Sequence, residues 1–565
     1  MRSTAALNII IKDYPDCMNI NLRLVLGGIM GIFKAGVESP ALAGAPLFFW
    51  DCLSAPIVAM LAILLTHKLV RSLWDGKESG RFPPGPSAWP VIGHLHLLTS
   101  LSHRAFSKFS QKYGPIVGLR LGQQLAVAIS SPELAKEVLH THDKVFANRP
   151  PFHFNDLLLG GQNSDIVFSA QCPQWRKQRK ICTVGLFTAK RLQELEYVRQ
   201  EEVSSLLARV QEESAGATQA VDIGHCVNEM TCQLIMRLLQ SEGTMLAGGE
   251  NLVELVREME LQVSVPMMRD LIPALSCLDF LRKRRMRRLH ARMQTAFTAV
   301  LARRKQSTLN SSHHYNDLLQ SLLSKEVQVD IDGTFSAADQ ETLTPNEIKG
   351  ILLDMMGGGI HTTSLTLEWA MAELLKNPHC LEKLRREIDD VVFDSAGKRR
   401  IKNNISDADV AKLSYLKCVM KETARLHPVL PMLLPRFSTA ECKIKGYSIP
   451  ARTIVFVNVW AIGRDEQAWP NAGEFRPERF DEQEVDLRGQ HYELLPFGSG
   501  RRICPAVQLA LSVVELTLAN LVHRFDWQLP PGVTPASLNM QEKDGISNKK
   551  ATPTLAIPKP RLFTD

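Results

Sequence analysis

Apolar and polar residues follow two different periods along this chain. After about Ser130 and up to about Leu430, apolar residues recur at the three- and four-residue spacing of amphipathic helices. Two other regions, Ile116–Ser130 and about Cys442–Val459, have the apolar runs and turn residues that are typical of strands. A last helical pattern, Val507–Phe525, follows a glycine-rich loop. The pattern therefore predicts a mainly α-helical fold with smaller β-sheets.

One long apolar stretch, Pro46–Thr66, precedes these elements. A transmembrane helix needs about 20 mostly apolar residues, so this stretch is long enough to span a bilayer. Four basic residues follow it, Lys68, Arg71, Lys77 and Arg81. Because positive charges are held on the cytosolic side, we expect a single-pass transmembrane anchor over residues 45–66 with the remainder of the chain in the cytosol. Asp51 and Pro56 leave a buried or interfacial helix open as the alternative.

The anchor separates two short segments from the rest of the chain. Residues 1–44 form an extension of unknown role that contains a shorter apolar run, Leu22–Phe33. Residues 67–86 form a basic hinge that ends in Pro83-Pro84-Gly85-Pro86. Successive prolines fix φ and remove backbone donors, so we expect a stiff connector to a globular domain over residues 87–565.

Composition and charge exclude several classes of protein. The 565 residues include 45% hydrophobic and 22% charged residues, which is near the globular average, and the net charge is +7. The basic run Arg282–Arg288 lies inside a helical pattern, so we interpret it as a solvated or membrane-facing helix and expect no nucleic-acid partner. The 11 cysteines form no CxxC pair, which argues against a disulfide scaffold or a zinc ribbon. Any functional cysteine is therefore expected to act singly.

The most informative segment is the glycine-rich loop Pro496–Pro505, which ends in a cysteine just before a helical pattern. Glycines let the backbone turn tightly, so that N–H groups can point at the sulfur of Cys504. The N-terminus of the following helix also favours negative charge. This arrangement favours a thiolate, which could act as a nucleophile or as a metal ligand.

Within this loop, Phe497, Gly500, Arg502 and Cys504 match the haem-binding signature FxxGxRxCxG of the cytochrome P-450 family, with Ala506 in place of the last glycine. Other family motifs follow in the expected order: WxxxR at Trp175 and Arg179, ExxR at Glu422 and Arg425, and PERF at Pro477–Phe480. The chain resembles the membrane-bound, plant A-type members of this family from about Pro83 to Leu562.

The resemblance implies a P-450 fold that binds haem b, with the thiolate of Cys504 as the axial iron ligand. Further haem contacts are expected from matching positions, namely Trp175, Arg179, Arg436, Phe497 and Arg502. Glu422, Arg425 and Arg479 are expected to form the family's buried charge triad. This triad is structural, because removing one member leaves an unpaired charge in the core.

The family's distal helix has a pattern like AGxDTT, and the aligned residues here are Gly358-Gly359-Ile360-His361-Thr362-Thr363. The resemblance implies that Gly359 opens space for oxygen and that Thr362 helps to deliver protons. His361 replaces the expected carboxylate, which leaves three alternatives. The imidazole relays protons itself; or it occupies a salt bridge or packing site while water and Thr362 deliver protons; or the reaction has changed to an isomerisation or dehydration.

By family position, a substrate should contact Phe154, Val429, Leu430, Met432 and Leu433, which are all apolar. The segment Leu538–Glu542 faintly resembles flavonoid ring hydroxylases, which favours phenolic over terpenoid substrates.

The resemblance therefore implies an NADPH- and O2-dependent monooxygenase of the endoplasmic reticulum membrane. It would hydroxylate a small apolar plant specialised metabolite with electrons from NADPH–cytochrome P-450 reductase. The alternatives are a P-450-fold isomerase or dehydratase that needs no external electrons, and a non-catalytic haem-binding or ligand-sensing protein.

Overall fold

The computed structural model describes residues 82–98, 101–161, 164–241, 246–310, 316–324, 343–393, 404–481, 484–543 and 545–561. The predicted anchor, the N-terminal extension and residues 67–81 of the hinge lie outside these residues. Across the described ranges, we find no helix with the length and apolar character that crossing a bilayer requires.

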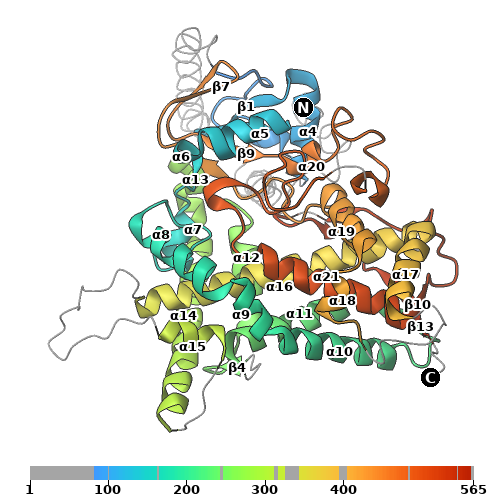
Figure 1. Ribbon diagram of the computed structural model, residues 1–565. Helices are drawn as coiled ribbons and strands as arrows, with labels where there is room; N and C mark the ends of the chain where they lie inside the picture. Colours follow the sequence, from blue (N-terminus) through green and yellow to red (C-terminus); the bar gives the residue numbers. More distant parts are fainter. Residues whose placement is uncertain are drawn as a thin grey trace, which may run out of the picture.

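Helices form most of the fold, as the sequence predicts (Figure 1). In chain order the α-helices are α4 (Ser102–Tyr113), α5 (Pro132–Lys136), α6 (Asp143–Phe146), α7 (His153–Leu158), α8 (Pro173–Lys180), α9 (Ala189–Glu194), α10 (Glu196–Glu213), α11 (Ile223–Gln240), α12 (Leu252–Val263), α13 (Met268–Leu271), α14 (Phe280–Asn310), α15 (Leu318–Leu323), α16 (Pro345–Lys376), α17 (Pro378–Val392), α18 (Asp407–Val410), α19 (Ser414–Leu426), α20 (Val459–Ile462) and α21 (Val507–Arg524). Short 3-10 or π turns are η2 (Leu95–Leu97), η3 (Glu137–Thr141), η4 (Ile181–Leu186), η5 (Pro273–Asp279), η6 (Pro477–Phe480) and η7 (Gly500–Arg502).

The largest sheet has the strand order β1-β2-β9-β6 and lies at one end of the molecule, beside α4, α5 and α20 (Figure 1). Its strands are β1 (Ile116–Leu121), β2 (Gln124–Ile129), β9 (Ile454–Val457) and β6 (Arg436–Phe437). The hairpin between β1 and β2 turns at Gly122, whose φ of +63° is readily adopted only by glycine. β9 then pairs in parallel with β2, so the two regions that the sequence predicts as strands meet in one sheet.

The remaining strands form small sheets. They are β3 (Val221–Asp222), β4 (Leu246–Ala247), β5 (Glu250–Asn251), β7 (Cys442–Ile444), β8 (Tyr447–Ile449), β10 (Phe525–Gln528), β11 (Glu542–Lys543), β12 (Lys549–Lys550) and β13 (Leu555–Pro560). β10 and β3 flank β13, and the other strands pair as the hairpins β4-β5, β7-β8 and β11-β12. Together with the dominant helices, these sheets confirm the predicted fold class.

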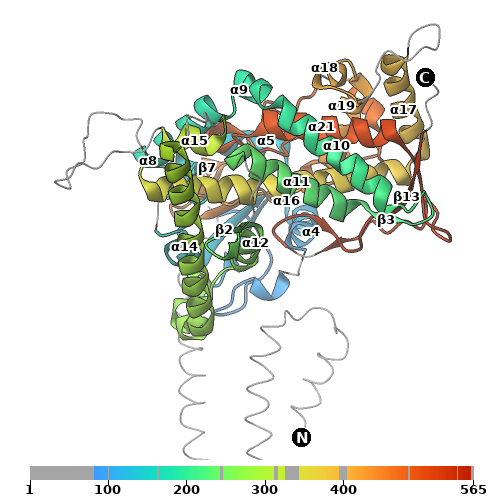
Figure 2. The same ribbon diagram turned by 90° about the horizontal axis from the view of Figure 1, so that it is seen from below.

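The helix α16 runs through the middle of the helical layer and contacts α11, α12, α19 and α21 (Figures 1 and 2). It begins with a capping box, in which the Thr344 hydroxyl accepts from the Glu347 N–H (3.2 Å) and the Glu347 carboxylate accepts from the Thr344 N–H (2.7 Å). Pro345 occupies its first turn, and Pro378 follows its end. Because α16 is surrounded, its 32 residues bury side chains on nearly every face.

A buried acid fixes the C-terminal hairpin β11-β12 against α4 and α20. The Glu542 carboxylate accepts hydrogen bonds from Arg104 Nε (2.7 Å), Trp460 Nε1 (3.0 Å) and Asn548 Nδ2 (3.0 Å), and it lies 3.1 Å from His103 Nε2. Burial alone would raise the pKa of Glu542, but the hydrogen bonds and charges of His103 and Arg104 lower it to about 2. The hairpin therefore depends on an ionised carboxylate.

Candidate active site

The glycine-rich loop Pro496–Pro505, here called the cysteine loop, contains η7 and ends just before α21. Gly498 and Gly500 have φ values of +70° and +69°, and a side chain at position 500 would meet the carbonyl oxygen of Leu139 at 2.0 Å. Only glycine can therefore turn the chain here. The turn is closed by the Cys504 N–H, which donates to the Phe497 carbonyl (3.0 Å).

The sulfur of Cys504 is held inside the protein next to a basic side chain. Burial raises the pKa of its thiol, whereas the Ala506 N–H and the charge of Arg179 lower it. Cys504 is nevertheless only partly buried, whereas six other cysteines of the described ranges are buried, namely Cys182, Cys226, Cys232, Cys380, Cys418 and Cys442. A partly accessible sulfur whose thiolate is favoured by a nearby positive charge is suited to binding a metal ion.

Four arginines gather around this loop and point their guanidinium groups at backbone carbonyls. Arg502 donates to Ala147 (2.8 Å), Ile166 (3.2 Å) and Ser169 (2.5 Å). Arg436 donates to Ser499 (3.1 Å), and Arg179 donates to Ile503. Arg149 donates to Val167 (2.9 Å), Leu434 (2.8 Å) and Pro435 (2.8 Å).

Trp175 joins this group from α8. Its indole N–H donates to the Ile166 carbonyl (3.0 Å), and the guanidinium of Arg502 lies 4.0 Å from the centre of its ring. The N-terminus of α8 is capped by Cys172, which accepts from the backbone N–H of Trp175. Trp175 and Arg179 therefore reach the cysteine loop from one helix, as the WxxxR spacing predicts.

The buried positive charge of this cluster is only partly neutralised by protein groups. Burial, together with repulsion between the arginines, lowers the pKa of Arg149 well below its usual range and that of Arg502 to about 9. Burial likewise lowers the pKa of Arg436 to about 10, against the attraction of Asp143. The charge of Asp165 acts on both Arg149 and Arg502, and burial raises the pKa of that carboxyl as well. An anion with two carboxylates, such as haem with its propionates, fits this surplus of cations.

Arg149 is a site residue that the sequence did not reveal. It is 9% exposed and lies in the segment after α6, followed by Pro150 and Pro151. No motif or periodicity singles it out there, because an arginine in an irregular segment is usually solvated.

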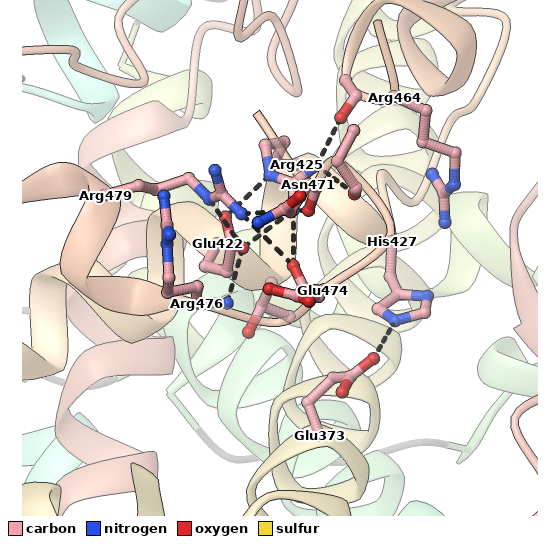
Figure 3. Close-up of polar contacts among 12 residues, drawn as sticks. Glu373, Glu422, Arg425, His427, Arg464, Asn471, Glu474, Arg476 and Arg479 are labelled. Atoms are coloured by element: carbon pink, nitrogen blue, oxygen red, sulfur yellow. Dashed lines mark hydrogen bonds and ion pairs between the residues drawn. The ribbon is translucent and has the colours of Figure 1, made fainter. Parts of the chain in front are cut away.

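The three residues of the predicted charge triad meet in the core (Figure 3). Glu422 pairs with Arg425 through Nε (2.7 Å) and Nη2 (2.8 Å), and with Arg479 through Nε (3.0 Å). The remaining donors of both arginines bind carbonyls of the segment Gly463–Glu474. The triad therefore joins α19 to η6 and to the segment that leads toward the cysteine loop.

The predicted distal helix is α16, and its neighbouring glycines Gly358 and Gly359 have different surroundings. A side chain at Gly358 would meet nothing within 4 Å, whereas one at Gly359 would lie 2.8 Å from Ile235 of α11. The open space predicted at Gly359 thus lies at Gly358 instead, because successive helical residues point about 100° apart. The hydroxyl of Thr362 donates to the Gly358 carbonyl (2.7 Å), which places that hydroxyl beside the open space.

His361 lies on the same turn and contacts an acid from another helix. Its Nε2 is 3.2 Å from Oε2 of Glu260 on α12. No sequence pattern points to Glu260, because it is one of several acids on an amphipathic helix.

The predicted substrate residues fall in two places. Phe154 is 2% exposed and packs edge-on against Phe168, with 5.1 Å between the ring centres. The other four lie in the segment between α19 and β6, namely Val429, Leu430, Met432 and Leu433. Leu433 adopts a φ of +49° and lies next to Gly498, so this segment reaches the cysteine loop. A separate cavity of about 270 Å³ between α7, α14 and α16 contains none of the five residues in its lining.

Comparison with known proteins identifies the class. The Cytochrome P450 family model matches residues 83–556, and the chain belongs to this family. A flavonoid 3'-monooxygenase from Petunia hybrida is 36% identical over 91% of this chain and 98% of its own length. Geraniol 8-hydroxylase from Catharanthus roseus is 36% identical over 88% and 99% of the two chains. Desmethyl-deoxy-podophyllotoxin synthase from Sinopodophyllum hexandrum is 34% identical over 90% and 97%.

A solved structure agrees with this assignment. A zebra fish cytochrome P-450 with abiraterone is similar with a TM-score of 0.65 and 26% identity, covering 82% of this chain and 99% of its own. The chain is therefore a cytochrome P-450 monooxygenase with the haem and cysteine-thiolate ligation of its family. The cysteine loop and the arginine cluster fit that group.

Proposed function

We propose that this chain is a membrane-anchored monooxygenase that hydroxylates a small apolar plant metabolite of the phenolic, flavonoid-like class. It would take electrons from NADPH through NADPH–cytochrome P-450 reductase. The observation that supports the monooxygenase chemistry best is the partly buried Cys504 beside a buried arginine cluster whose charge protein groups neutralise only in part. The phenolic class rests on flavonoid 3'-monooxygenases from two plants among the relatives, at 36% identity.

The chain's own residues would divide the work as follows. Cys504 would hold the iron, while Trp175 and the arginines 149, 179, 436 and 502 would hold the two propionates. Phe497, within the cysteine loop, would contact the haem. When bound, haem with a thiolate ligand supplies oxygen activation. The Thr362 hydroxyl lies beside the open space at Gly358 and would pass protons into that space, where oxygen would bind.

The substrate side of this proposal rests on apolar surfaces. Phe154 and the segment with Val429, Leu430, Met432 and Leu433 offer dispersion contacts and no charged anchor. An aromatic or terpenoid skeleton would suit such surfaces, whereas an anionic substrate would not.

Attachment to the endoplasmic reticulum membrane forms a further part of the proposal. It rests on the apolar stretch 45–66 and the basic residues after it. Near the start of α14, Leu278, Phe280 and Leu281 are 53%, 66% and 76% exposed beside a run of arginines, a combination that suits an anionic lipid surface. Alkaline carbonate extraction of microsomes should leave the full-length protein in the membrane fraction, and its release would contradict the anchor.

The experiment that tests this function uses microsomes with the protein and the reductase. They are incubated with flavonoids, other phenolics and terpenoids, with and without NADPH. We expect NADPH-dependent hydroxylation within the phenolic group. Conversion of terpenoids alone would overturn the substrate class, and turnover without NADPH would favour an isomerase or dehydratase.

Cys504→Ser is the matched variant for the haem ligand. Because an alcohol does not ionise as a thiol does, this variant should lose the carbon-monoxide spectrum of a thiolate-bound haem and all monooxygenase activity. A spectrum identical to that of the wild type would mean that the sulfur is not the ligand.

A further inference from the structure

The helix α12 crosses α16 one turn before Thr362. A side chain at Gly357 would lie 3.7 Å from Met259 and Val256 of α12, so the glycine allows the two helices to approach closely. One turn further along α16, His361 Nε2 lies 3.2 Å from Oε2 of Glu260. On α16, His361 thus stands where the family has an acid, and the acid beside it is Glu260 of the neighbouring helix α12.

The surroundings of this pair combine partial burial with a route to solvent. The His361 side chain is 18% exposed and that of Glu260 is 25% exposed. Three further titratable groups act on the pair, namely Arg257 of α12, Lys549 of β12 and Cys232 of α11. Burial raises the pKa of the Cys232 thiol to about 11, so that thiol is neutral near pH 7. The charges that act on both partners of the pair are those of Lys549 and Arg257.

Burial acts in opposite directions on the two partners. It raises the pKa of Glu260 to about 7, against the charges of Lys549 and Arg257, and it lowers the pKa of His361 to about 4, in the same direction as these charges. Between these two values the pair holds one proton, along a contact short enough for its transfer. A group that releases a proton near neutral pH is suited to general acid catalysis.

We propose that Glu260 and His361 form a proton relay from solvent to the distal side of the haem, with Thr362 as the next group. The inference rests on the monooxygenase class and not on the phenolic substrate. The Glu260 carboxyl gives its proton to Nε2 of His361, and the imidazole releases a proton from its other nitrogen. Glu260 then takes a new proton from solvent. The imidazole, which now carries its proton on Nε2, exchanges it through solvent for one on Nδ1, and the pair returns to its starting state.

In this relay Glu260 acts through His361 and is a positioning and proton-supplying residue. Its test is Glu260→Gln, which keeps the shape of the side chain and removes the acidic proton. The matched control is Glu258→Gln on the same helix, because Glu258 is 33% exposed and faces Arg292 of α14 at 2.8 Å. The measurement is the hydrogen peroxide released per NADPH consumed, with any compound of the panel that the wild type hydroxylates.

We expect Glu260→Gln to raise this peroxide ratio several-fold and Glu258→Gln to leave it unchanged. The haem content and the affinity for substrate should be the same in both variants. Product formation by the wild type should fall as pH rises through about 7, as Glu260 loses its proton. Glu260→Gln should lack this pH dependence. Equal peroxide ratios in the two variants would overturn the relay.

A rescue variant separates proton supply from structural support. His361→Asp places an acid directly on α16, so Glu260 is no longer required. In that background, Glu260→Gln should leave the peroxide ratio unchanged. A loss of coupling as large as in the wild-type background would show that Glu260 supports the structure only.

A last readout needs no turnover. The infrared band of a protonated carboxyl should disappear with an apparent pKa of about 7 in the resting enzyme and be absent from Glu260→Gln. An ionised Glu260 throughout the neutral range would overturn the proton-supplying role. The peroxide measurement can use any phenolic or terpenoid that the wild type hydroxylates, and the infrared measurement needs no substrate. Both tests of the relay therefore remain valid if the proposed phenolic substrate class is wrong.

Discussion

Replacing Glu422 by glutamine should remove a large part of the stability of this protein. The carboxylate is fully buried and lies between Arg425 and Arg479, which are 1% and 4% exposed. It accepts three charge-assisted bonds of 2.7–3.0 Å from these side chains and a fourth bond, of 2.8 Å, from the Arg476 N–H (Figure 3). Glutamine keeps one acceptor oxygen and turns an NH2 group toward a guanidinium.

The loss of unfolding free energy expected for Glu422→Gln follows from the burial of the carboxylate. Removing one partner of a buried ion pair costs about 3–5 kcal/mol, because the remaining charge has neither a counterion nor water. Domains are stable by only about 5–15 kcal/mol in total. We therefore expect Glu422→Gln to lower the midpoint of thermal unfolding sharply and to reduce the fraction of expressed protein that binds haem.

The chain offers a control with the same spacing at the surface. Glu382 pairs with Arg385 three residues later on α17 at 3.3 Å, and the two side chains are 45% and 22% exposed. Such surface pairs contribute at most about 0.5 kcal/mol, so Glu382→Gln should unfold close to the wild-type temperature. Differential scanning calorimetry and the carbon-monoxide difference spectrum measure both variants. Similar midpoints for the two variants would refute the argument from burial.

Two further predictions concern other parts of the fold. The pKa of Glu542 is lowered to about 2 in the folded protein, compared with about 4.3 in the unfolded chain. The ionised carboxylate therefore stabilises the fold fully above about pH 4.3, and this stabilisation is lost as pH falls from about 4.3 to about 2. Glu542→Gln should therefore flatten the dependence of the unfolding temperature on pH below about 4.3, measured by calorimetry. On α16, Gly350→Ala would place a methyl group 1.8 Å from the Ser164 carbonyl oxygen, whereas Gly358→Ala meets open space. Thermal unfolding should show a loss of stability for Gly350→Ala and a gain of up to about 1 kcal/mol for Gly358→Ala. A more stable Gly350→Ala than Gly358→Ala would contradict the close approach of Ser164 to Gly350.

Local patterns in the sequence were enough to predict much of the fold. The region Ile116–Ser130 forms the hairpin β1-β2, and Val507–Phe525 forms α21 to within one residue. Glu422 and Arg425 stand three residues apart, which on a helix puts them on one face, and they pair as expected. These features depend on neighbours in the chain or on a motif whose members have fixed spacing.

Features that depend on packing between distant segments could not be predicted in the same way. Arg149 has no partner within its own segment, and its three carbonyl acceptors come from two other parts of the chain. The difference between Gly358 and Gly359 arises because Ile235 of α11 lies beside Gly359, whereas a side chain at Gly358 would meet nothing within 4 Å. A sequence pattern indicates which residues share a helical face, but it does not indicate what covers that face.

His361 illustrates this limit most clearly. From the sequence, a salt bridge and a proton relay are separate alternatives for the imidazole. In the structure both alternatives concern one contact, between the imidazole and an acid whose pKa burial raises to about 7. An acid of this kind pairs with the imidazole and still has a proton to give near neutral pH. The exchange of Asp for His on α16 therefore does not require the loss of acid chemistry from the distal side, since α12 supplies the carboxyl group at the same turn of the helix.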